Sequence, residues 1–265
     1  MVYIMHKIAK ILILLPFIFS PLFSNSNELN QLINETFPNQ RLVFGVKIIG
    51  TEHTPSKSIK KASSILKQWL DNDNDGNPDN QVVIESIIQN NGMLIMGKSE
   101  SDFEDAFDTL IEVFEEKNLD IDNFEKSIVG LISNEPNIAY LEEILHLITQ
   151  VGYANAYPEI FGEFKGSQIS KAMDIARGGY FENTPTSYPK KAWYHYNDKT
   201  CDYSCMITEY FYWSLTSLLG AQKNRFEDIS DEWELNTPQK MKKDVLILRL
   251  FDNSEFKIPT TLPKF

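Results

Sequence analysis

Residues 141–149, Leu-Glu-Glu-Ile-Leu-His-Leu-Ile-Thr, place two carboxylates and an imidazole within five positions of one another. Glu142 and His146 are four residues apart, so on a helix their side chains project from one face, one turn apart. This is the spacing that a pair of metal ligands on a helix requires. Glu143 follows Glu142 directly, so its carboxylate could serve as a general base next to the metal ligand. The segment therefore predicts a metal site with an adjacent base.

The surrounding residues predict an amphipathic helix that begins near Pro136. One side of this helix is apolar: Ile138, Leu141, Ile144, Leu145, Leu147, Ile148 and Val151. The opposite side carries Glu142, Glu143, His146, Thr149 and Gln150. A solvated polar face that includes a histidine would also explain this pattern, because a glutamate and a histidine often occur at this spacing.

Glu209 is the charged residue that favours a metal site over a solvated face. It is the one charged residue between Tyr203 and Gln222, in a predicted helix from Tyr203 to Leu219 with apolar side chains nearly all round. Burying an isolated carboxylate costs several kcal/mol unless the group is protonated or paired. Glu209 therefore needs a partner, which is either a metal, an arginine such as Arg177, or a tyrosine.

The E-E-x-x-H helix followed by a glutamate on a later helix resembles the zincin metallopeptidases whose third metal ligand is such a glutamate. The resemblance covers the 142–146 motif, Glu209 and the order of sheet followed by helices. It implies Glu142, His146 and Glu209 as ligands of Zn²⁺ or Mn²⁺, and Glu143 as the general base that activates water.

Glu142 departs from the family pattern, which has a histidine at this position. Two carboxylates and one imidazole nearly neutralise a divalent ion, which lowers its Lewis acidity and favours harder ions such as Mn²⁺ or Ca²⁺ over Zn²⁺. His195, in Trp193-Tyr194-His195-Tyr196, is the candidate for a compensating role. It would supply a second imidazole or donate a hydrogen bond to the transition state; otherwise it is a surface loop residue.

An acidic loop, Asp-Asn-Asp-Asn-Asp-Gly-Asn-Pro-Asp at 71–79, predicts a second ion site within residues 71–82. Alternating carboxylates around a glycine resemble the Ca²⁺ loops of EF-hands, dockerins and thrombospondin type-3 repeats. The resemblance implies the following ligands: the side chains of Asp71, Asp73 and Asp75, the carbonyl of Asn77, and Asp79 directly or through water. Val82 replaces the bidentate glutamate of an EF-hand, which predicts weaker binding unless Glu85 joins the site. A solvated turn between two helices is the alternative.

The hydrophobic pattern predicts an α+β fold: a small sheet with flanking helices, followed by a helical, loop-rich lobe, as in a zincin-like domain. The predicted strands cover residues 41–49, 93–96 and 127–132. The predicted helices cover residues 56–70, capped by Ser56; 81–89; and 101–117, capped by Ser101; the metal helix and the helix at 203–219 follow. We expect one domain over residues 27–265.

Residues 1–26 predict a signal peptide, with Lys7 and Lys10 before a short apolar run. Its removal takes away two lysines and no acid, which changes the net charge from −12 to −14. This acidity disfavours nucleic acid as a partner. We expect a secreted protein (periplasmic in a bacterium) that is not inserted in a membrane after cleavage, with Cys201 and Cys205 in a local disulfide.

Tyrosines are concentrated in the second half of the chain: Tyr153, Tyr157, Tyr180, Tyr188, Tyr194 and Tyr196. They would either line a cleft that binds a peptide or glycan, or pack in the core of the second lobe. The functional expectation is a secreted, metal-dependent, peptidase-like hydrolase with a structural Ca²⁺. The alternative is a non-catalytic extracellular binding protein with a degenerate metal site and a tyrosine-rich ligand surface.

Overall fold

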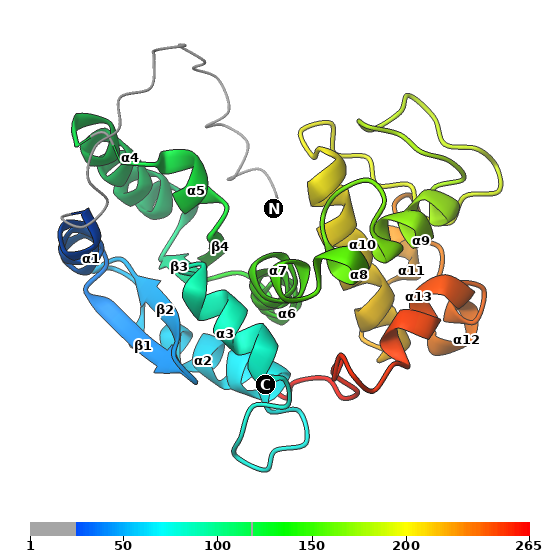
Figure 1. The fold of residues 1–265 in the computed structure, drawn as a ribbon, viewed down its shortest axis with the longest axis horizontal. Coiled ribbons are helices and arrows are strands. Elements are labelled where there is room, and N and C mark those ends of the chain that lie inside the picture. The colour runs from blue at the N-terminus through cyan, green and yellow to red at the C-terminus, as the bar shows by residue number, and fades with distance from the viewer. Residues whose placement is uncertain (1–24, 118) are drawn as a thin grey trace.

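The computed structural model describes residues 25–117 and 119–265, and it has the expected α+β architecture. A lobe with a small sheet and helices α1–α5 lies on one side of the molecule, and a lobe of helices α8–α13 on the other; α6 and α7 run between them (Figure 1). The sheet contains β1 (Asn39–Val43), β2 (Val46–Gly50), β3 (Met93–Gly97) and β4 (Ile128–Ile132), in that order. β1 and β2 are antiparallel, and the other pairs are parallel.

The parallel strands are buried on both faces because helices cover both. Successive side chains point to opposite faces of a strand, so Ile48 and Leu94 face one core and Ile49 and Ile95 the other. The first core is shared with α2 (Ser56–Leu70) and α3 (Gln81–Gln89). The second lies under α1 (Asn25–Thr36), α4 (Glu100–Glu116) and α5 (Ile121–Glu125). This two-sided burial explains why β3 and β4 are almost continuous apolar runs.

Several predicted boundaries hold and three need correction. Helices 56–70 and 81–89 and the strands at β3 and β4 are confirmed within one residue. The single strand predicted at 41–49 is wrong: Phe44 and Gly45, at φ 51° and 91°, turn the chain into a hairpin. Ser99, not Ser101, caps α4 by accepting from the Asp102 N–H. Pro55, not Ser56, stands at the N-cap of α2.

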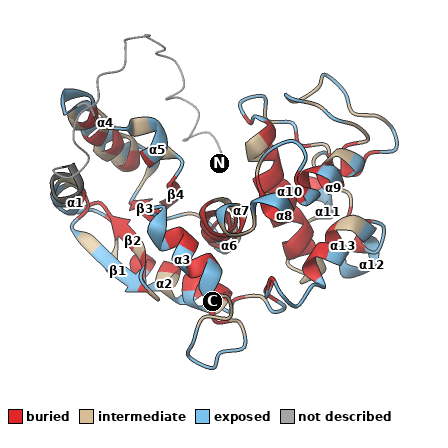
Figure 2. Ribbon diagram, in the orientation of Figure 1, coloured by how far each residue is buried: buried red, intermediate tan, exposed pale blue. Residues whose placement is uncertain are grey.

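The second lobe is built around α10 (Tyr203–Leu218), which is buried along most of its length (Figure 2). The shorter helices α8 (Pro158–Phe161), α9 (Gln168–Ala176), α11 (Phe226–Ile229), α12 (Pro238–Met241) and α13 (Val245–Phe251) surround it. The predicted Cys201–Cys205 disulfide is confirmed and joins the loop before α10 to its first turn. Asp202 caps the same turn by accepting from the Cys205 N–H. Both the disulfide and the Asp202 cap therefore stabilise the start of the helix that carries Glu209.

The expected signal segment, residues 1–26, lies outside the described residues except for Asn25 and Ser26, which begin α1. Among residues 25–117 and 119–265, no helix has the length and apolar character needed to cross a bilayer.

Candidate metal centre

The helix that carries the E-E-x-x-H motif changes its winding immediately after the histidine. α6 (Asn137–His146) starts after Pro136, as predicted, and continues into a π-helix, η2 (Leu147–Tyr153), and then α7 (Ala154–Ala156). π-helical turns are rare and occur frequently at functional sites. This turn offsets the residues after His146 from their α-helical positions, and no feature of the apolar spacing announces it.

The polar face of α6 is covered rather than solvated. Glu143, His146 and Thr149 are only 8%, 7% and 4% exposed. α10 packs against α6 and η2 on the side of these residues and supplies Glu209, which is 2% exposed. Glu142 and Gln150 of the same face stay partly exposed, so most of this face is covered, which argues against the solvated-face alternative; the predicted burial of Glu209 is confirmed.

Glu142, His146 and Glu209 come together as one cluster. Each offers one ligand atom, and these atoms all lie within 4.8 Å of one another. The Nε2 atom of His146 is 3.8 Å from the Oε2 atom of Glu209. Both atoms are buried, and neither has a hydrogen-bond partner. Unpartnered buried polar atoms are uncommon and costly, so two of them facing each other indicate room for a missing partner.

The electrostatics of the cluster favour a cation. Burial raises the pKa of Glu142 to about 7 and the pKa of Glu209 well above its usual range. Burial also lowers the pKa of His146 to about 3, so the imidazole is neutral at pH 7. The neutral imidazole is ready to bind, while the carboxyl groups would release their protons to a bound divalent ion, which would offset the cost of their buried charge.

The donor set and its spacing fit a divalent transition metal. Ligand atoms at about 2.0–2.1 Å from a tetrahedral Zn²⁺ lie roughly 3.3–3.4 Å apart, so the 3.8 Å between His146 and Glu209 needs only a small contraction. Two carboxylates and one imidazole would balance the charge of the ion and suit Mn²⁺ as well as Zn²⁺.

Two tyrosines that the sequence did not single out for this role act on the carboxylates. The Tyr212 hydroxyl lowers the pKa of Glu142 and the Tyr196 hydroxyl lowers the pKa of Glu209, each against the larger effect of burial. The Tyr212 ring also packs edge-on against the His146 ring, with centroids 5.6 Å apart. Tyr212 lies three residues after Glu209, on the same face of α10, and this i, i+3 spacing was the available signal.

Glu143 lies beside the imidazole. Its Oε2 atom is 3.8 Å from His146 Nδ1, on the ring nitrogen that does not face Glu209. Burial raises the pKa of Glu143 well above its usual range, and the charge of Glu142 acts in the same direction. A carboxylate with a raised pKa accepts a proton more readily than a solvated glutamate does, which suits a general base.

Within the part of the chain that the structure describes, Arg177 makes no ion pair or hydrogen bond with Glu209. Its Nη1 donates to the Phe181 carbonyl at 2.8 Å, and its guanidinium lies over the Phe181 and Tyr188 rings. Of the partners considered for Glu209, the arginine is therefore not used, and the Glu209 Oε2 atom has no hydrogen-bond partner.

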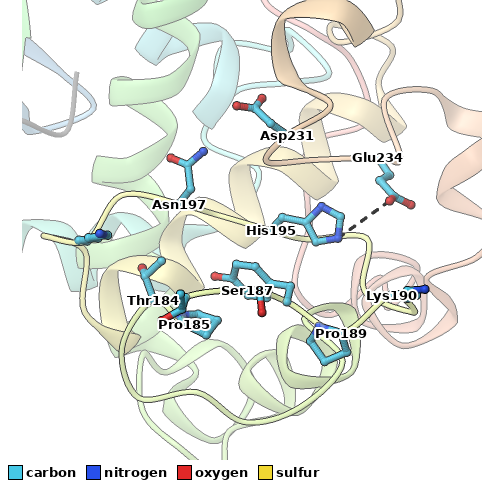
Figure 3. A pocket seen from close by; sticks show the side chains of 12 residues that line it. Thr184, Pro185, Ser187, Pro189, Lys190, His195, Asn197, Asp231 and Glu234 are labelled. Atoms are coloured by element: carbon cyan, nitrogen blue, oxygen red, sulfur yellow. Dashed lines mark ion pairs between the residues drawn. The ribbon is translucent and has the colours of Figure 1, made fainter.

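His195 lies outside the cluster. Its neighbours Tyr194 and Tyr196 are buried, while the His195 side chain is 22% exposed and its Nε2 lies 3.9 Å from Glu234 Oε1. The imidazole lines a pocket of about 800 Å³ formed with residues 184–190, Asn197, Lys199 and Asp231 (Figure 3). The structure thus associates His195 with this pocket and with Glu234, and not with His146.

The tyrosine-rich segments contribute more to the core than to a surface. Tyr153, Tyr194 and Tyr196 are buried, and Tyr180 is exposed. Tyr157 packs against Phe256, and Tyr188 lines the pocket of His195. Core packing is therefore the role of half of the six tyrosines.

The acidic loop brings three of its predicted ligands together. Oxygens of Asp71, Asp73 and Asp79 lie within 4.8 Å of one another, and Asp71 Oδ1 is buried without a hydrogen-bond partner. Gly76, at φ 93°, allows the turn, and its N–H donates to Asp71 Oδ2 at 3.1 Å. Asp75 is not in this group of side chains, and its carboxylate accepts from the Asn77 N–H at 2.7 Å. The predicted binding of the Asn77 backbone carbonyl stays a prediction.

Charge and burial at this loop also favour a cation. Burial raises the pKa of Asp79, and the neighbouring carboxylates of Asp73 and Asp71 raise it further. Lys67 Nζ lies 3.8 Å from Asp71 Oδ2 and is the nearby cationic side chain. Because Lys67 is half-exposed, it neutralises the cluster only weakly.

The loop also holds the final segment of the chain, which crosses back from α13 to the sheet lobe (Figure 1). Asn72 Oδ1 accepts from the N–H groups of Thr260 and Thr261 at 2.8 and 2.9 Å. Asn80, just after the loop, donates to the Phe256 carbonyl at 2.7 Å. The conformation of the loop and the position of residues 256–264 are therefore linked.

Ca²⁺ should protect this final segment from proteolysis. Chelation should expose residues 256–264, and Asp71→Asn should weaken Ca²⁺ binding at least about tenfold because the site loses a buried ligand charge. Calorimetric titration and limited proteolysis with and without Ca²⁺ would measure both effects. Asn72→Ala is the matched control, since it should bind Ca²⁺ normally and still be cleaved. Equal cleavage of the wild type with and without Ca²⁺ would contradict the link.

Searches of protein-family models, curated protein sequences and solved structures found no match to this chain. Function must therefore be argued from the chemistry of the site itself.

Proposed function

We propose that this protein is an exported, metal-dependent hydrolase that acts on peptides and carries a structural Ca²⁺ in the 71–79 loop. Glu142, His146 and Glu209 would hold one Zn²⁺ or Mn²⁺. The observation that carries the proposal is the buried pair of atoms, His146 Nε2 and Glu209 Oε2, which face each other at 3.8 Å without hydrogen-bond partners. A disulfide and an apolar leader support export to an oxidising compartment.

The proposed reaction uses the residues around the cluster. A divalent ion held there would act as a Lewis acid on the substrate carbonyl and on water. Glu143 would accept a proton from the attacking water and pass it to the leaving amine. Tyr212, which packs edge-on against the His146 ring, would hold this imidazole in ligand orientation. The resemblance of the motif to zincins supports peptides as the substrate class.

Metal removal tests the proposal. Protein stripped of transition metal, with Ca²⁺ kept at saturation, should lose hydrolysis of a library of quenched fluorescent peptides. One equivalent of Mn²⁺ or Zn²⁺ should restore it, and the more effective ion identifies the metal. Hydrolysis that continues undiminished in the stripped protein would contradict the proposal.

A binding protein is the second candidate, and the pocket of His195 favours it. This pocket of about 800 Å³ is lined by hydroxyl, amide and charged groups, and the metal ligands are not among its lining residues. Such a mixture suits a polar peptide or glycan. In that case a labelled peptide or glycan should bind in a manner sensitive to Glu234→Ala, and no hydrolysis should accompany binding.

A further inference from the structure

The π-turn that follows His146 is held in place by α3, the helix that begins directly after the acidic loop. η2 packs against α3, and the Ser86 hydroxyl of α3 donates to the Val151 carbonyl of η2 at 3.1 Å. Gly152 lets the two helices approach closely, because a Cβ atom at this position would meet Val83 Cγ1 at 2.7 Å. Ser86 and Val83 are both buried. The turn after the metal ligand His146 therefore depends on a helix of the sheet lobe.

The final segment of the chain holds the other end of η2. Tyr153, the last residue of η2, is buried, and its hydroxyl proton is shared between the carbonyls of Phe256 and Lys257 at 3.0 and 3.1 Å. Asn80 donates to the same Phe256 carbonyl at 2.7 Å, and it caps α3 by accepting from the Val83 N–H at 3.1 Å. The residue directly after the acidic loop thus contacts both segments that hold the π-turn.

The acidic loop joins the end of α2 to the start of α3. The Asp79 N–H donates to the Leu70 carbonyl at 2.8 Å, and Asp79 Oδ2 accepts from the Asn72 N–H at 2.8 Å. Without a cation, the carboxylates of Asp71, Asp73 and Asp79 repel one another, because their oxygens lie within 4.8 Å. Asp71 is 2% exposed, and its Oδ1 has no hydrogen-bond partner. Ca²⁺ would replace this repulsion with attraction and so stabilise the junction of the two helices.

We infer that the Ca²⁺ loop and the metal centre are coupled through α3 and η2, so that Ca²⁺ bound at 71–79 strengthens the binding of the transition metal between α6 and α10. This coupling, which rests on the proposed function with its two ion sites, makes Ser86 and Tyr153 positioning residues. They hold the π-turn and thereby the end of α6 that presents His146. Coupling between two binding sites is reciprocal, so the transition metal should strengthen Ca²⁺ binding by the same factor.

Titration with Co²⁺ in the presence and absence of Ca²⁺ measures the coupling. Protein freed of metal on a chelating resin would be titrated with Co²⁺ and followed by the visible absorption band that the wild type shows and His146→Ala lacks. Ca²⁺ should lower the Co²⁺ dissociation constant of the wild type by at least about fivefold, the lower end of the usual coupling between sites. Asp71→Asn, at a Ca²⁺ concentration that fills only the wild-type loop, should show no such change. This control separates the loop from any direct effect of Ca²⁺ at the metal centre.

A double variant tests the route of the coupling. Ser86→Ala combined with Tyr153→Phe removes the two hydroxyls that hold η2 and keeps every ligand of the loop. Ca²⁺ should therefore still bind, but it should no longer lower the Co²⁺ dissociation constant. Ser170→Ala combined with Tyr210→Phe is the matched control, because it removes two buried hydroxyls that donate within the second lobe at 3.0 and 2.6 Å. This control should keep the wild-type response to Ca²⁺.

Three results would overturn the inference in distinguishable ways. If Ca²⁺ left the Co²⁺ dissociation constant of the wild type unchanged or raised it, or lowered it equally in the wild type and in the Ser86→Ala, Tyr153→Phe variant, the coupling would be refuted. Loss of the band in His146→Ala would still support the metal centre. A wild type without the band, or a band that persists in His146→Ala, would overturn the metal centre and the coupling together. Absence of Ca²⁺ binding by the wild type in calorimetry would remove the Ca²⁺ site and the coupling, but not the metal centre.

Discussion

Glu143→Gln should retain the bound transition metal and lower peptide hydrolysis by about 10²–10⁴-fold, the usual effect of losing a general base. Glutamine keeps the size of the side chain but cannot accept the proton of water. Residue 143 lies on α6 between the proposed ligand Glu142 and the apolar Ile144, and because glutamine matches glutamate in size the helix should keep its position. Metal content by mass spectrometry and initial rates on a fluorescent peptide would be compared with the wild type.

Glu143 lies beside His146 Nδ1, so its alternative role would be to orient this imidazole. A residue that only orients the imidazole would change metal affinity by about 10–100-fold and affect the rate through occupancy alone. If the rate of Glu143→Gln returned to the wild-type value at saturating metal, its role as a base would be refuted. Glu135→Gln is the comparison variant, because this half-buried glutamate precedes the same helix and acts on Glu143 only through its charge.

Glu209→Gln should abolish metal binding and leave the metal-free protein folded. Burial raises the pKa of Glu209 well above its usual range, so the neutral acid is favoured without a cation, and glutamine reproduces its shape and charge. The ion, in contrast, needs the carboxylate. We expect at least about a 100-fold loss of metal affinity, the upper end of what outer partners of a metal ligand produce. Titration and thermal unfolding would be measured on the same samples.

Asp244→Asn provides the contrasting case for this prediction. Asp244 is also a buried carboxylate of the second lobe, but its Oδ2 accepts from Tyr210 and Trp193 at 2.6 and 3.1 Å. Its replacement should lower the free energy of unfolding by about 1–3 kcal/mol and leave metal affinity unchanged. If Glu209→Gln destabilised the metal-free protein as much as Asp244→Asn and still bound metal, Glu209 would be a structural residue.

The sequence predicted two kinds of site residue: those at a regular local spacing, and a charged residue that stands alone in an otherwise apolar helix. Glu142 and His146 were found from helical periodicity, and Glu209 because a lone carboxylate in an apolar helix requires a partner. The clustering of Asp71, Asp73 and Asp79 followed from alternation around a glycine. β3, β4 and the first helices were equally accessible, because these strands are nearly continuous apolar runs and the helices have a regular apolar period.

Other features depend on contacts between distant segments, which no local pattern encodes. The hydrogen bond from Ser86 to Val151 joins residues 65 positions apart, and the π-turn after His146 is a matter of backbone winding. The hairpin at Phe44 was missed because a phenylalanine with positive φ leaves no turn signature. His195 was grouped with the metal ligands by residue type, whereas alternation along the extended segment 194–196 directs it away from Tyr194 and Tyr196.

The most direct test of the central claim is the metal content of the exported protein, measured by mass spectrometry on wild type and His146→Ala prepared in parallel with excess Ca²⁺. The cluster of Glu142, His146 and Glu209 predicts one equivalent of transition metal in the wild type and its loss in the variant, with Ca²⁺ unchanged in both. Ca²⁺ alone in both proteins, or the same transition-metal content in both, would contradict a metal centre on α6 and α10.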